Sequence, residues 1–454
     1  MSDNQTPMIT LAGGGLVGSL LALILAKKGY RVEVYESRPD LRRVDISAGR
    51  SINLALANRG IKPLEQLGLM SKINDMIIPM RGRMVHVEGE TATLQPYGQH
   101  EYDVIYSISR GELNSFLLTE AENTGLVTIH FDSKISQVDF DTNQLSIVQG
   151  EHSQTVSFDK LIGTDGANSV VRDAILALND NSQLSVDVLD HSYKELHISP
   201  DSQGQHKIDK QALHIWPRGQ FMLIALPNQD GSFTVTLFMH TQGETSFATV
   251  KDEATINAFF DAHFASIKPE LENLVGTYIE NPTGSMATIK CGPWNYADKG
   301  LIIGDAAHAI VPFHGQGMNC GFEDCQSIAE HFPAANEAES ADWHALFANI
   351  AKLRKPNADA IADMALENYI EMRDSVIQDS FLQKKAFAFK LQQWFPARFT
   401  PRYAMVMFQH RPYQEAYALG KIHDRLLQEL CESYSSVDEL TQQDADTLLT
   451  RYGL

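Results

Sequence analysis

The stretch that decides the fold is residues 8–36, MITLAGGGLVGSLLALILAKKGYRVEVYE. Residues 8–12 predict a short apolar strand, and residues 20–28 predict a helix that ends at Gly29. Residues 32–36 alternate like a strand and finish on an acid. This order predicts the β-α-β unit that opens a doubly wound, Rossmann-like α/β domain.

Three glycines and one acid in this stretch follow the spacing of a dinucleotide site. Gly13 permits a tight turn, Gly15 lets the backbone approach a pyrophosphate, and Gly18 lets the helix pack on the strand. The helix N-terminus offers amide donors and a positive dipole to phosphate. Glu36 is placed to accept from ribose hydroxyls, which favours an unphosphorylated ribose, as in FAD or NAD. A plain glycine turn is the alternative interpretation.

Two later strand ends carry Gly and Asp, which favours FAD over NAD. They are LIGTDGANS (161–169), with Asp165, and LIIGDAAH (301–308), with Asp305; PFHGQGMN (312–319) then leads into a helix. Contacts this widely spread predict a discontinuous FAD-binding domain with an insertion. We expect the domain at 1–75, 100–180 and 288–330, a β-sheet substrate domain at 76–99 and 181–287, and a C-terminal helical region at 331–454.

Within these regions the pattern predicts particular elements. Residues 221–226 and 233–238 predict two strands joined by a turn at 227–231. Residues 341–352 predict one helix, and a second is expected from an Asn357 cap to about residue 378. The last 20 residues are polar and acidic, so we expect a solvated helix or a loose tail there.

Composition narrows the class of protein. Of 454 residues, 37 are Lys or Arg and 57 are Asp or Glu, a formal net charge of −20 that disfavours nucleic acid and anionic lipid. The four cysteines have no zinc or disulfide spacing, so we expect reduced thiols in a cytoplasmic protein. No run reaches the length of a membrane span, and no metal site is predicted. Oligomeric state is open.

The three motifs around Gly13, Asp165 and Asp305 resemble the FAD-dependent aromatic hydroxylases of the para-hydroxybenzoate hydroxylase type. Further segments resemble the kynurenine 3-monooxygenase family, and in particular its soluble bacterial members that have no membrane anchor. These segments are RSINLAL (50–56), Arg83 with Tyr97, SISR (107–110) and PFHGQGMN (312–319).

The resemblance implies a flavin monooxygenase with tightly bound FAD and with NADPH and O2 as co-substrates. Its reaction hydroxylates L-kynurenine to 3-hydroxykynurenine through a flavin C4a-hydroperoxide, in tryptophan degradation. The implied FAD contacts, together with the motif residues, are Gly13, Gly15, Val17, Gly18, Glu36, Arg38, Ala55, Arg110, Ile135, Asp165, Asp305, Gly317, Met318 and Asn319. The implied substrate contacts are Arg83, Tyr97, Asn368, Tyr403, Ile224, Phe238, Phe313, His314 and Met372.

Residue chemistry supports part of this set. A planar guanidinium such as that of Arg83 pairs in two-pronged fashion with a carboxylate. His314 is a candidate for proton transfer, but a wall or loop role is favoured because the cofactor carries the hard chemistry. Alternatives are a hydroxylase of another aromatic acid or amine, a flavin reductase that does not use O2, and a catalytically idle FAD-binding regulator. The NADPH site is not located.

Overall fold

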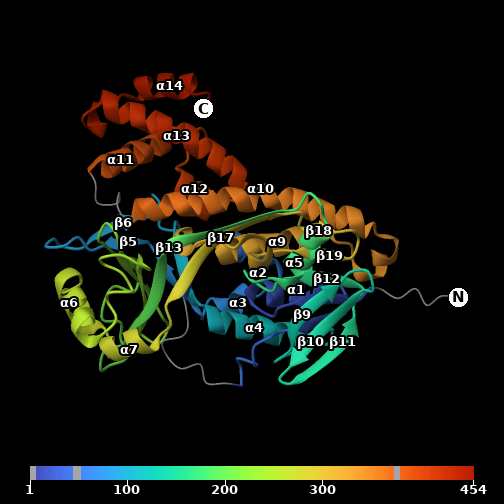
Figure 1. Cartoon of the computed structure of the whole chain (residues 1–454). Coiled ribbons are helices and arrows are strands. Elements are labelled where there is room, and N and C mark those ends of the chain that lie inside the picture. The colour runs from blue at the N-terminus through green and yellow to red at the C-terminus, as the bar shows by residue number, and fades with distance from the viewer. Residues whose placement is uncertain (1–6, 44–52, 373–378) are drawn as a thin grey trace. The chain divides into compact units, whose positions relative to one another are not determined.

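The computed structural model describes residues 7–43, 53–372 and 379–454 (Figure 1). The chain divides into two units. The first comprises Met1–Ile77, Ile108–Leu189 and Met286–Ala362, and the second comprises Ile78–Ser107, Asp190–Ser285 and Asp363–Leu454. The helical region expected from residue 331 is divided between these units, with residues up to Ala362 in the first and Asp363–Leu454 in the second.

The first unit is built on a sheet in the order β18-β19-β12-β1-β2-β8, in which the five strands β19, β12, β1, β2 and β8 run parallel. The strands are β1 Ile9–Ala12, β2 Val32–Tyr35, β8 Val127–His130, β12 Lys160–Gly163, β18 Asn295–Tyr296 and β19 Gly300–Ile302. β1 lies between β2 and β12, and the chain leaves it in a glycine turn. Ligands of doubly wound sheets bind at the carboxyl ends of strands around such a point.

Helices and smaller elements complete this unit. α1 packs against both α4 and α9. A second, antiparallel sheet has the order β11-β10-β9. The bounds are α1 Leu16–Lys27, β3 Asn53–Leu56, α2 Asn58–Gln66, α3 Met70–Ile73, α4 Arg110–Glu122, β9 Lys134–Asp139, β10 Gln144–Gln149, β11 His152–Ser157, α5 Val170–Ala177, α8 Asp305–His308, η2 Pro312–His314, α9 Gly317–His331 and η3 Ala335–Ser340.

The second unit is built on the sheet β17-β13-β16-β15-β14-β5-β6. Its strands are β5 Gly82–Val85, β6 Thr93–Pro96, β13 Gln183–Ile198, β14 Ala212–Pro217, β15 Met222–Pro227, β16 Phe233–His240 and β17 Gly284–Gly292. Two of these strands, β13 and β17, have one end in the first unit. The same holds for β4 Ile77–Met80 and β7 Ile105–Ser109. The predicted strand pair at 221–226 and 233–238 is confirmed as β15 and β16. One face of the sheet packs with α6 Glu253–His263 and α7 Leu274–Glu280 into an apolar core. Between these two helices lies η1 Lys268–Glu270.

The helical segments differ from the sequence interpretation in two places. α10 runs unbroken from Trp343 to Ile370, and Asn357 lies inside it and donates to the Leu353 carbonyl, so the predicted cap at Asn357 was wrong. The expected end of that helix near residue 378 lies outside the described residues. Of the described helices, none is long and apolar enough to cross a membrane.

The last 20 residues are not a loose tail. They hold a packed helix, because Ala445, Leu448 and Leu449 share one buried face of it. The C-terminal helices are α11 Asp379–Trp394, α12 Arg402–Met407, α13 Tyr413–Ser433, η5 Val437–Glu439 and α14 Gln442–Arg451.

Candidate functional site

The glycine turn after β1 has the geometry that a pyrophosphate requires. Gly13 has φ +95°, and a Cβ there would lie 2.7 Å from the Thr164 carbonyl oxygen. A Cβ on Gly18 would lie 2.0 Å from the Gly13 oxygen, so α1 packs on the turn only without a side chain. At Gly15, by contrast, the nearest atom is Arg38 Nη2 at 3.9 Å. The backbone at Gly15 is therefore open to a ligand, and the turn fits FAD.

Glu36 lies at the end of β2 and is buried. Its carboxylate accepts from the Gly14 amide at 2.8 Å and from the Arg38 amide at 2.8 Å, and the Arg38 guanidinium pairs with it at 2.9 Å. Burial alone would raise the pKa of Glu36, but the hydrogen bonds and charge of Arg38 outweigh burial and lower it. Glu36 is therefore an ionised acceptor fixed beside the glycine turn.

The two other strand ends use their carboxylates differently. Asp165 accepts from the Ser169 hydroxyl at 2.5 Å and the Val170 amide at 2.8 Å, so both of its oxygens hold the start of α5. Asp305 is accessible to solvent. Surrounding protein raises the pKa of Asp305, and the charges of His308 and Arg110 oppose that rise. Among these two, Asp305 is the carboxylate left accessible for a ligand.

Asn319, in the first turn of α9, supports the neighbouring backbone. Its amide oxygen accepts from the Ala57 amide at 2.9 Å, and its nitrogen donates to the carbonyls of Ala55 at 2.8 Å and Gly315 at 2.7 Å. The side chain is fully buried. It therefore positions Ala55, and any direct contact with a cofactor falls to the backbone amides that begin α9.

A buried network behind these segments was missed from the sequence. Asp324, on α9, accepts from the Gly304 amide at 2.9 Å, from His308 Nε2 at 2.6 Å and from Arg354 Nε at 2.7 Å. Its exposure is 0%. The three bonds tie the turn before Asp305 to α9 and α10. No motif in the sequence signals this network, because its members lie on separate segments.

In the second unit, strand register places one set of predicted contacts together. Arg83 on β5 lies opposite Leu213 on β14, and Ile215 on β14 lies opposite Ile224 on β15. Phe238 on β16 lies opposite Met222, two residues from Ile224. Because side chains alternate along a strand, Arg83, Ile224 and Phe238 share one face. The opposite face forms the apolar core with α6 and α7.

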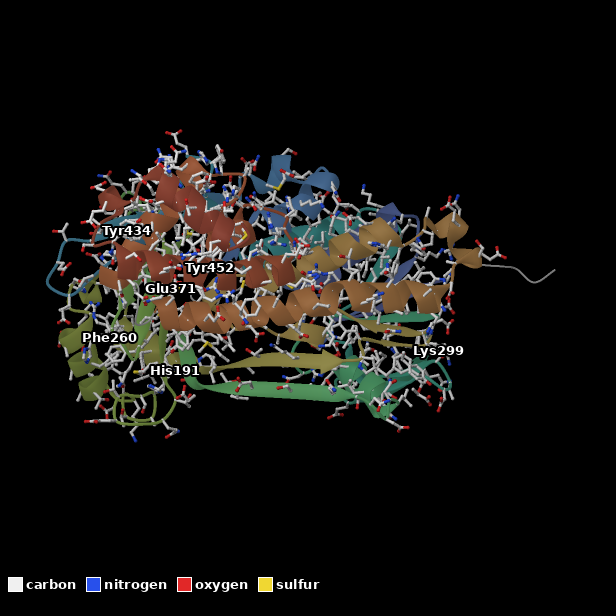
Figure 2. The ribbon with its side chains drawn as sticks, turned by 90° about the horizontal axis from the view of Figure 1, so that it is seen from above. His191, Phe260, Lys299, Glu371, Tyr434 and Tyr452 are labelled. Atoms are coloured by element: carbon white, nitrogen blue, oxygen red, sulfur yellow. The ribbon has the colours of Figure 1, made fainter. Side chains whose placement is uncertain are left out.

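Arg83 is the centre of a charged cluster on that face. Its guanidinium pairs with Glu371 Oε1 at 3.2 Å and donates to Asn368 Oδ1 at 3.4 Å, and it lies 5.2 Å from the ring centre of Tyr403. The Arg83 side chain is 10% exposed and that of Glu371 is 30% exposed (Figure 2 labels Glu371). Burial disfavours the charge of Arg83, but Tyr403 and Glu371 outweigh burial and raise its pKa.

Two tyrosines and a methionine complete the cluster. The rings of Tyr97 and Tyr403 stack at 5.3 Å. Burial raises the pKa of Tyr97 to about 12, so its hydroxyl stays protonated at neutral pH and is a donor for an anion. Asn368 Nδ2 contacts Met372 Sδ at 3.3 Å. The structure thus brings together Arg83, Tyr97, Asn368, Tyr403 and Met372 from three separate segments of the chain.

Two charged residues of this cluster were not predicted. One is Glu371, the ion-pair partner of Arg83. The other is Lys385 on α11, whose pKa is lowered to about 8 by burial and then by the charge of Arg83, against the opposing effect of Glu371. In the sequence, the only sign of a role for Glu371 is that it lies three residues after Asn368. The sequence gives no sign of a role for Lys385.

The remaining predicted residues lie in the first unit. Phe313 and His314 are buried in η2, and Ile135 is buried on β9; Val17, Ala55, Gly317 and Met318 are partly exposed, and Arg110 is exposed at the start of α4. Residues 50–52 of the RSINLAL segment lie outside the described residues. Participation of Phe313 and His314 in substrate binding stays a prediction.

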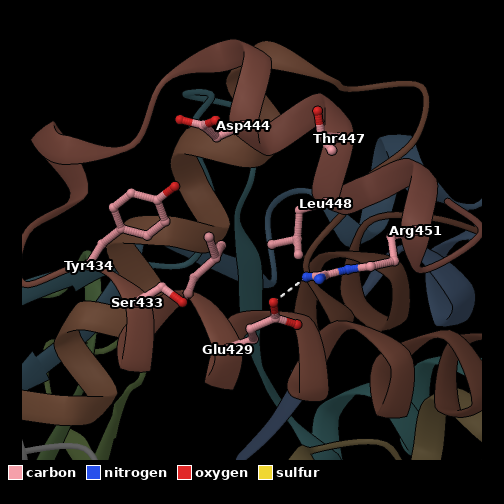
Figure 3. A pocket seen from close by; sticks show the side chains of 8 residues that line it. Glu429, Ser433, Tyr434, Asp444, Thr447, Leu448 and Arg451 are labelled. Atoms are coloured by element: carbon pink, nitrogen blue, oxygen red, sulfur yellow. Dashed lines mark hydrogen bonds and ion pairs between the residues drawn. The ribbon is translucent and has the colours of Figure 1, made fainter.

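A pocket of about 230 Å³ lies elsewhere, among the C-terminal helices (Figure 3). Its lining includes Glu429 on α13 and Arg451 on α14, which form an ion pair, and Tyr434 and Asp444. It contains none of the predicted site residues.

Comparisons with known proteins agree with this geometry. A family model described as an FAD binding domain matches residues 6–349. The kynurenine 3-monooxygenase of Myxococcus xanthus is 44% identical over 452 residues, covering 99% of this chain and 96% of that protein. The kynurenine 3-monooxygenase of Legionella pneumophila (strain Corby) is 39% identical over 446 residues, covering 98% of each.

Solved structures show the same fold. The tetrameric form of 2-methyl-3-hydroxypyridine-5-carboxylic acid oxygenase has a TM-score of 0.66 at 18% identity, covering 83% of this chain and 95% of that chain. PqsL of Pseudomonas aeruginosa, in complex with 2-aminobenzoylacetate, has a TM-score of 0.63 at 17% identity, covering 82% of this chain and 97% of that chain.

Proposed function

The chain belongs to the kynurenine 3-monooxygenase family of FAD-binding proteins, and on that premise we propose that it hydroxylates L-kynurenine to 3-hydroxykynurenine. NADPH and O2 are the co-substrates in this proposal. The observation that carries the choice of an amino acid substrate is the Arg83 cluster. It brings one buried guanidinium, the phenols of Tyr97 and Tyr403 and one carboxylate to the sheet face that also carries Ile224 and Phe238.

The cluster supplies complementary partners for both charged groups of an α-amino acid. Arg83 and the Tyr97 hydroxyl are donors for the carboxylate, with Asn368 supporting Arg83 at 3.4 Å. Glu371, partly exposed, is an acceptor for the ammonium group. Ile224 and Phe238 offer apolar surface to the aromatic ring. In this proposal, Glu371 pairs with Arg83 in the free protein, and the carboxylate of the substrate replaces Glu371 as the partner of Arg83 on binding.

The first unit holds the cofactor in the same proposal. Gly13, Gly15 and Gly18 accommodate the pyrophosphate, Glu36 accepts from the ribose, and Asp305 accepts from the ribityl chain. The free amides at the start of α9 favour negative charge nearby. When bound, FAD passes electrons from NADPH to O2 so that one oxygen atom reaches the ring. We assign His314 a role in the loop that precedes α9 rather than in proton transfer, supported by its burial.

We also place the enzyme in the cytoplasm. Free thiols at all four cysteines, three of them buried and Cys431 partly exposed, support a reducing compartment.

NADPH oxidation by the FAD-loaded protein, with and without L-kynurenine, tests the proposal. We expect strong stimulation by L-kynurenine in air and a product heavier by one oxygen atom. Equal turnover without O2 would identify a flavin reductase. Absence of stimulation by L-kynurenine, with stimulation by another aromatic acid or amine, would identify a hydroxylase of different specificity.

A further inference from the structure

A second cluster of acid and imidazole groups lies in the second unit, outside the Arg83 cluster. Asp190 and His191 are adjacent on β13, and His240 ends β16, where it lies directly opposite His191 in the antiparallel ladder. The two imidazole rings are 3.8 Å apart between their centres. His191 is 2% exposed, whereas the Asp190 side chain is 76% exposed (Figure 2 labels His191).

Both imidazoles turn the same nitrogen toward one carboxylate. His191 Nδ1 lies 2.5 Å from Asp190 Oδ1, and His240 Nδ1 lies 3.3 Å from Asp190 Oδ2. On the far side of its ring, His191 Nε2 lies 3.1 Å from the Gln220 carbonyl oxygen. Because a carbonyl only accepts, Nε2 carries a proton there. A neutral His191 then presents the lone pair of Nδ1 to a carboxylate, and this contact requires a positive species between them.

We propose that Asp190, His191 and His240 form a binding site for a divalent transition-metal ion, with Zn²⁺ as the preferred cation. A single proton on His191 would satisfy one contact, but a metal ion satisfies both Nδ1 atoms and the carboxylate together. Imidazole and carboxylate ligands suit Zn²⁺. A ring N–H donated to a backbone carbonyl, as His191 donates to Gln220, is the support that metal-ligating histidines usually have.

The ligand atoms of the three side chains lie within 4.8 Å of one another, and the distances from Asp190 to the two histidines fit after a small movement of Asp190. Two ligands of a tetrahedral zinc ion, each about 2.0–2.2 Å from the metal, lie roughly 3.3–3.5 Å from each other. The separation between His240 and Asp190 already meets this value, at 3.3 Å. The separation between His191 and Asp190, 2.5 Å, must widen by about 1 Å. Asp190 is exposed enough to move that far, and Tyr369, edge-on to His191 at 5.2 Å, holds the buried ring in place.

Among the described residues there is one other trio of potential metal ligands, and a positively charged side chain already occupies the position of the metal there. His308, Cys320 and Asp324 are all fully or nearly fully buried in the first unit. The Arg354 guanidinium already lies against them, 2.7 Å from Asp324 Oδ1 and 3.7 Å from Cys320 Sγ. A cation there would meet a fixed positive charge, so the same inference does not extend to that trio.

Zinc content of the purified full-length, FAD-loaded protein tests the proposal. After treatment with a chelator, the protein is dialysed against ZnCl2 at micromolar free concentration and analysed by elemental mass spectrometry, and its Tm is compared with and without zinc. We expect one tightly held zinc per chain and a Tm that rises with zinc, because a ligand that binds only the folded state stabilises it.

The variants decide where that zinc lies. His240→Ala and Asp190→Asn are each expected to lower zinc affinity by at least about tenfold and to abolish the Tm shift. Asp190→Asn changes an exposed side chain, so it tests the site without disturbing the core. His86→Gln is the matched control, because His86 belongs to another cross-strand histidine pair, with His214 at 2.9 Å and no carboxylate between them. Zinc binding that is absent in the wild type, or equal in the wild type and His240→Ala, would overturn the proposal.

Discussion

The two units build their candidate sites from different parts of the chain. In the first unit, the glycine turn and the start of α9 present backbone, and side chains such as Asn319 act by holding that backbone. In the second unit, Arg83 and its partners present side chains, and they come from segments far apart in the sequence. A backbone site depends on the absence of side chains, whereas a side-chain site depends on the meeting of distant residues.

The same contrast appears in the ion pairs. Glu36 and its partner Arg38 are two residues apart, and a backbone amide completes the arrangement. Arg83 and Glu371 are 288 residues apart, and Glu371 remains partly exposed. The first pair is a fixed part of the turn. In the proposed function, the second pair is the contact that the substrate carboxylate replaces.

The largest effect is expected from Arg83→Met. Loss of the guanidinium should weaken L-kynurenine binding by about 2–5 kcal/mol, or roughly 30-fold to several thousand-fold. Binding is measured by calorimetry with the FAD-loaded protein. Arg81→Met is the matched control, because Arg81 lies two residues away and is exposed. A change of less than threefold for Arg83→Met would remove this residue from the site.

Gly15→Ala should weaken FAD binding without lowering the thermal stability of the protein. A Cβ at Gly15 meets only the Arg38 guanidinium at 3.9 Å, so thermal stability without FAD should stay close to wild type. FAD affinity should fall by about 1–3 kcal/mol, since the methyl group takes space that the pyrophosphate needs. Gly18→Ala provides the contrast, because its Cβ would overlap the Gly13 oxygen and should lower Tm in the absence of FAD. Unchanged FAD affinity in Gly15→Ala would refute the assignment.

Glu371→Gln should change the preference between two ligands. L-Kynurenine should bind about fivefold more weakly, because the partly exposed carboxylate contributes about 1 kcal/mol to an ammonium group. The analogue without the α-amino group should bind at least as well as to the wild type, because Arg83 loses a competing partner. Parallel loss for both ligands would show that Glu371 acts only by orienting Arg83.

The smallest effect concerns pH. Lys385 has its pKa lowered from 10.5 to about 8, so its positive charge is present below that pH and is lost as the pH rises through it. Affinity for a substrate that carries a carboxylate should therefore fall by about threefold as Lys385 deprotonates. In Lys385→Gln, the dependence of KM on pH should lack this change. Comparison of the variant with the wild type also cancels the effect of the substrate's own ionisation. Identical profiles would exclude Lys385. The free energy of unfolding changes in the opposite direction to the affinity. Burial disfavours the charged form of Lys385 in the folded state, so the protein becomes more stable as the pH rises from about 8 toward 10.5.

The backbone site could be predicted from the sequence because its determinants are local. Gly13 and Gly15 lie in the turn after β1, Gly18 lies in the first turn of α1, and Glu36 follows the next strand, so spacing alone carries the geometry. The pair of strands β15 and β16 was equally readable, since a turn separates two apolar runs.

The side-chain site and the helical segments were harder to predict from the sequence, and the reason is physical. Which side chains pair with Arg83 depends on how Asn368 and Glu371, more than 280 residues further along the chain, pack against β5, and no local pattern reports it. Asn357 suggested the start of a second helix, but it lies inside α10, because packing of the buried Ala358 and Ile361 outweighs the local preference. The network around Asp324 was not predicted for the same reason, since its donors come from residues 304–308 and from Arg354, on segments apart from its own.

The isotope content of the product tests the central claim most directly. The FAD-loaded protein is supplied with NADPH, L-kynurenine and ¹⁸O2, and the product is analysed by mass spectrometry. We predict 3-hydroxykynurenine that carries one ¹⁸O atom. Oxidation of NADPH with kynurenine recovered unchanged, or a hydroxyl oxygen that derives from water, would contradict the claim that this chain hydroxylates kynurenine with molecular oxygen.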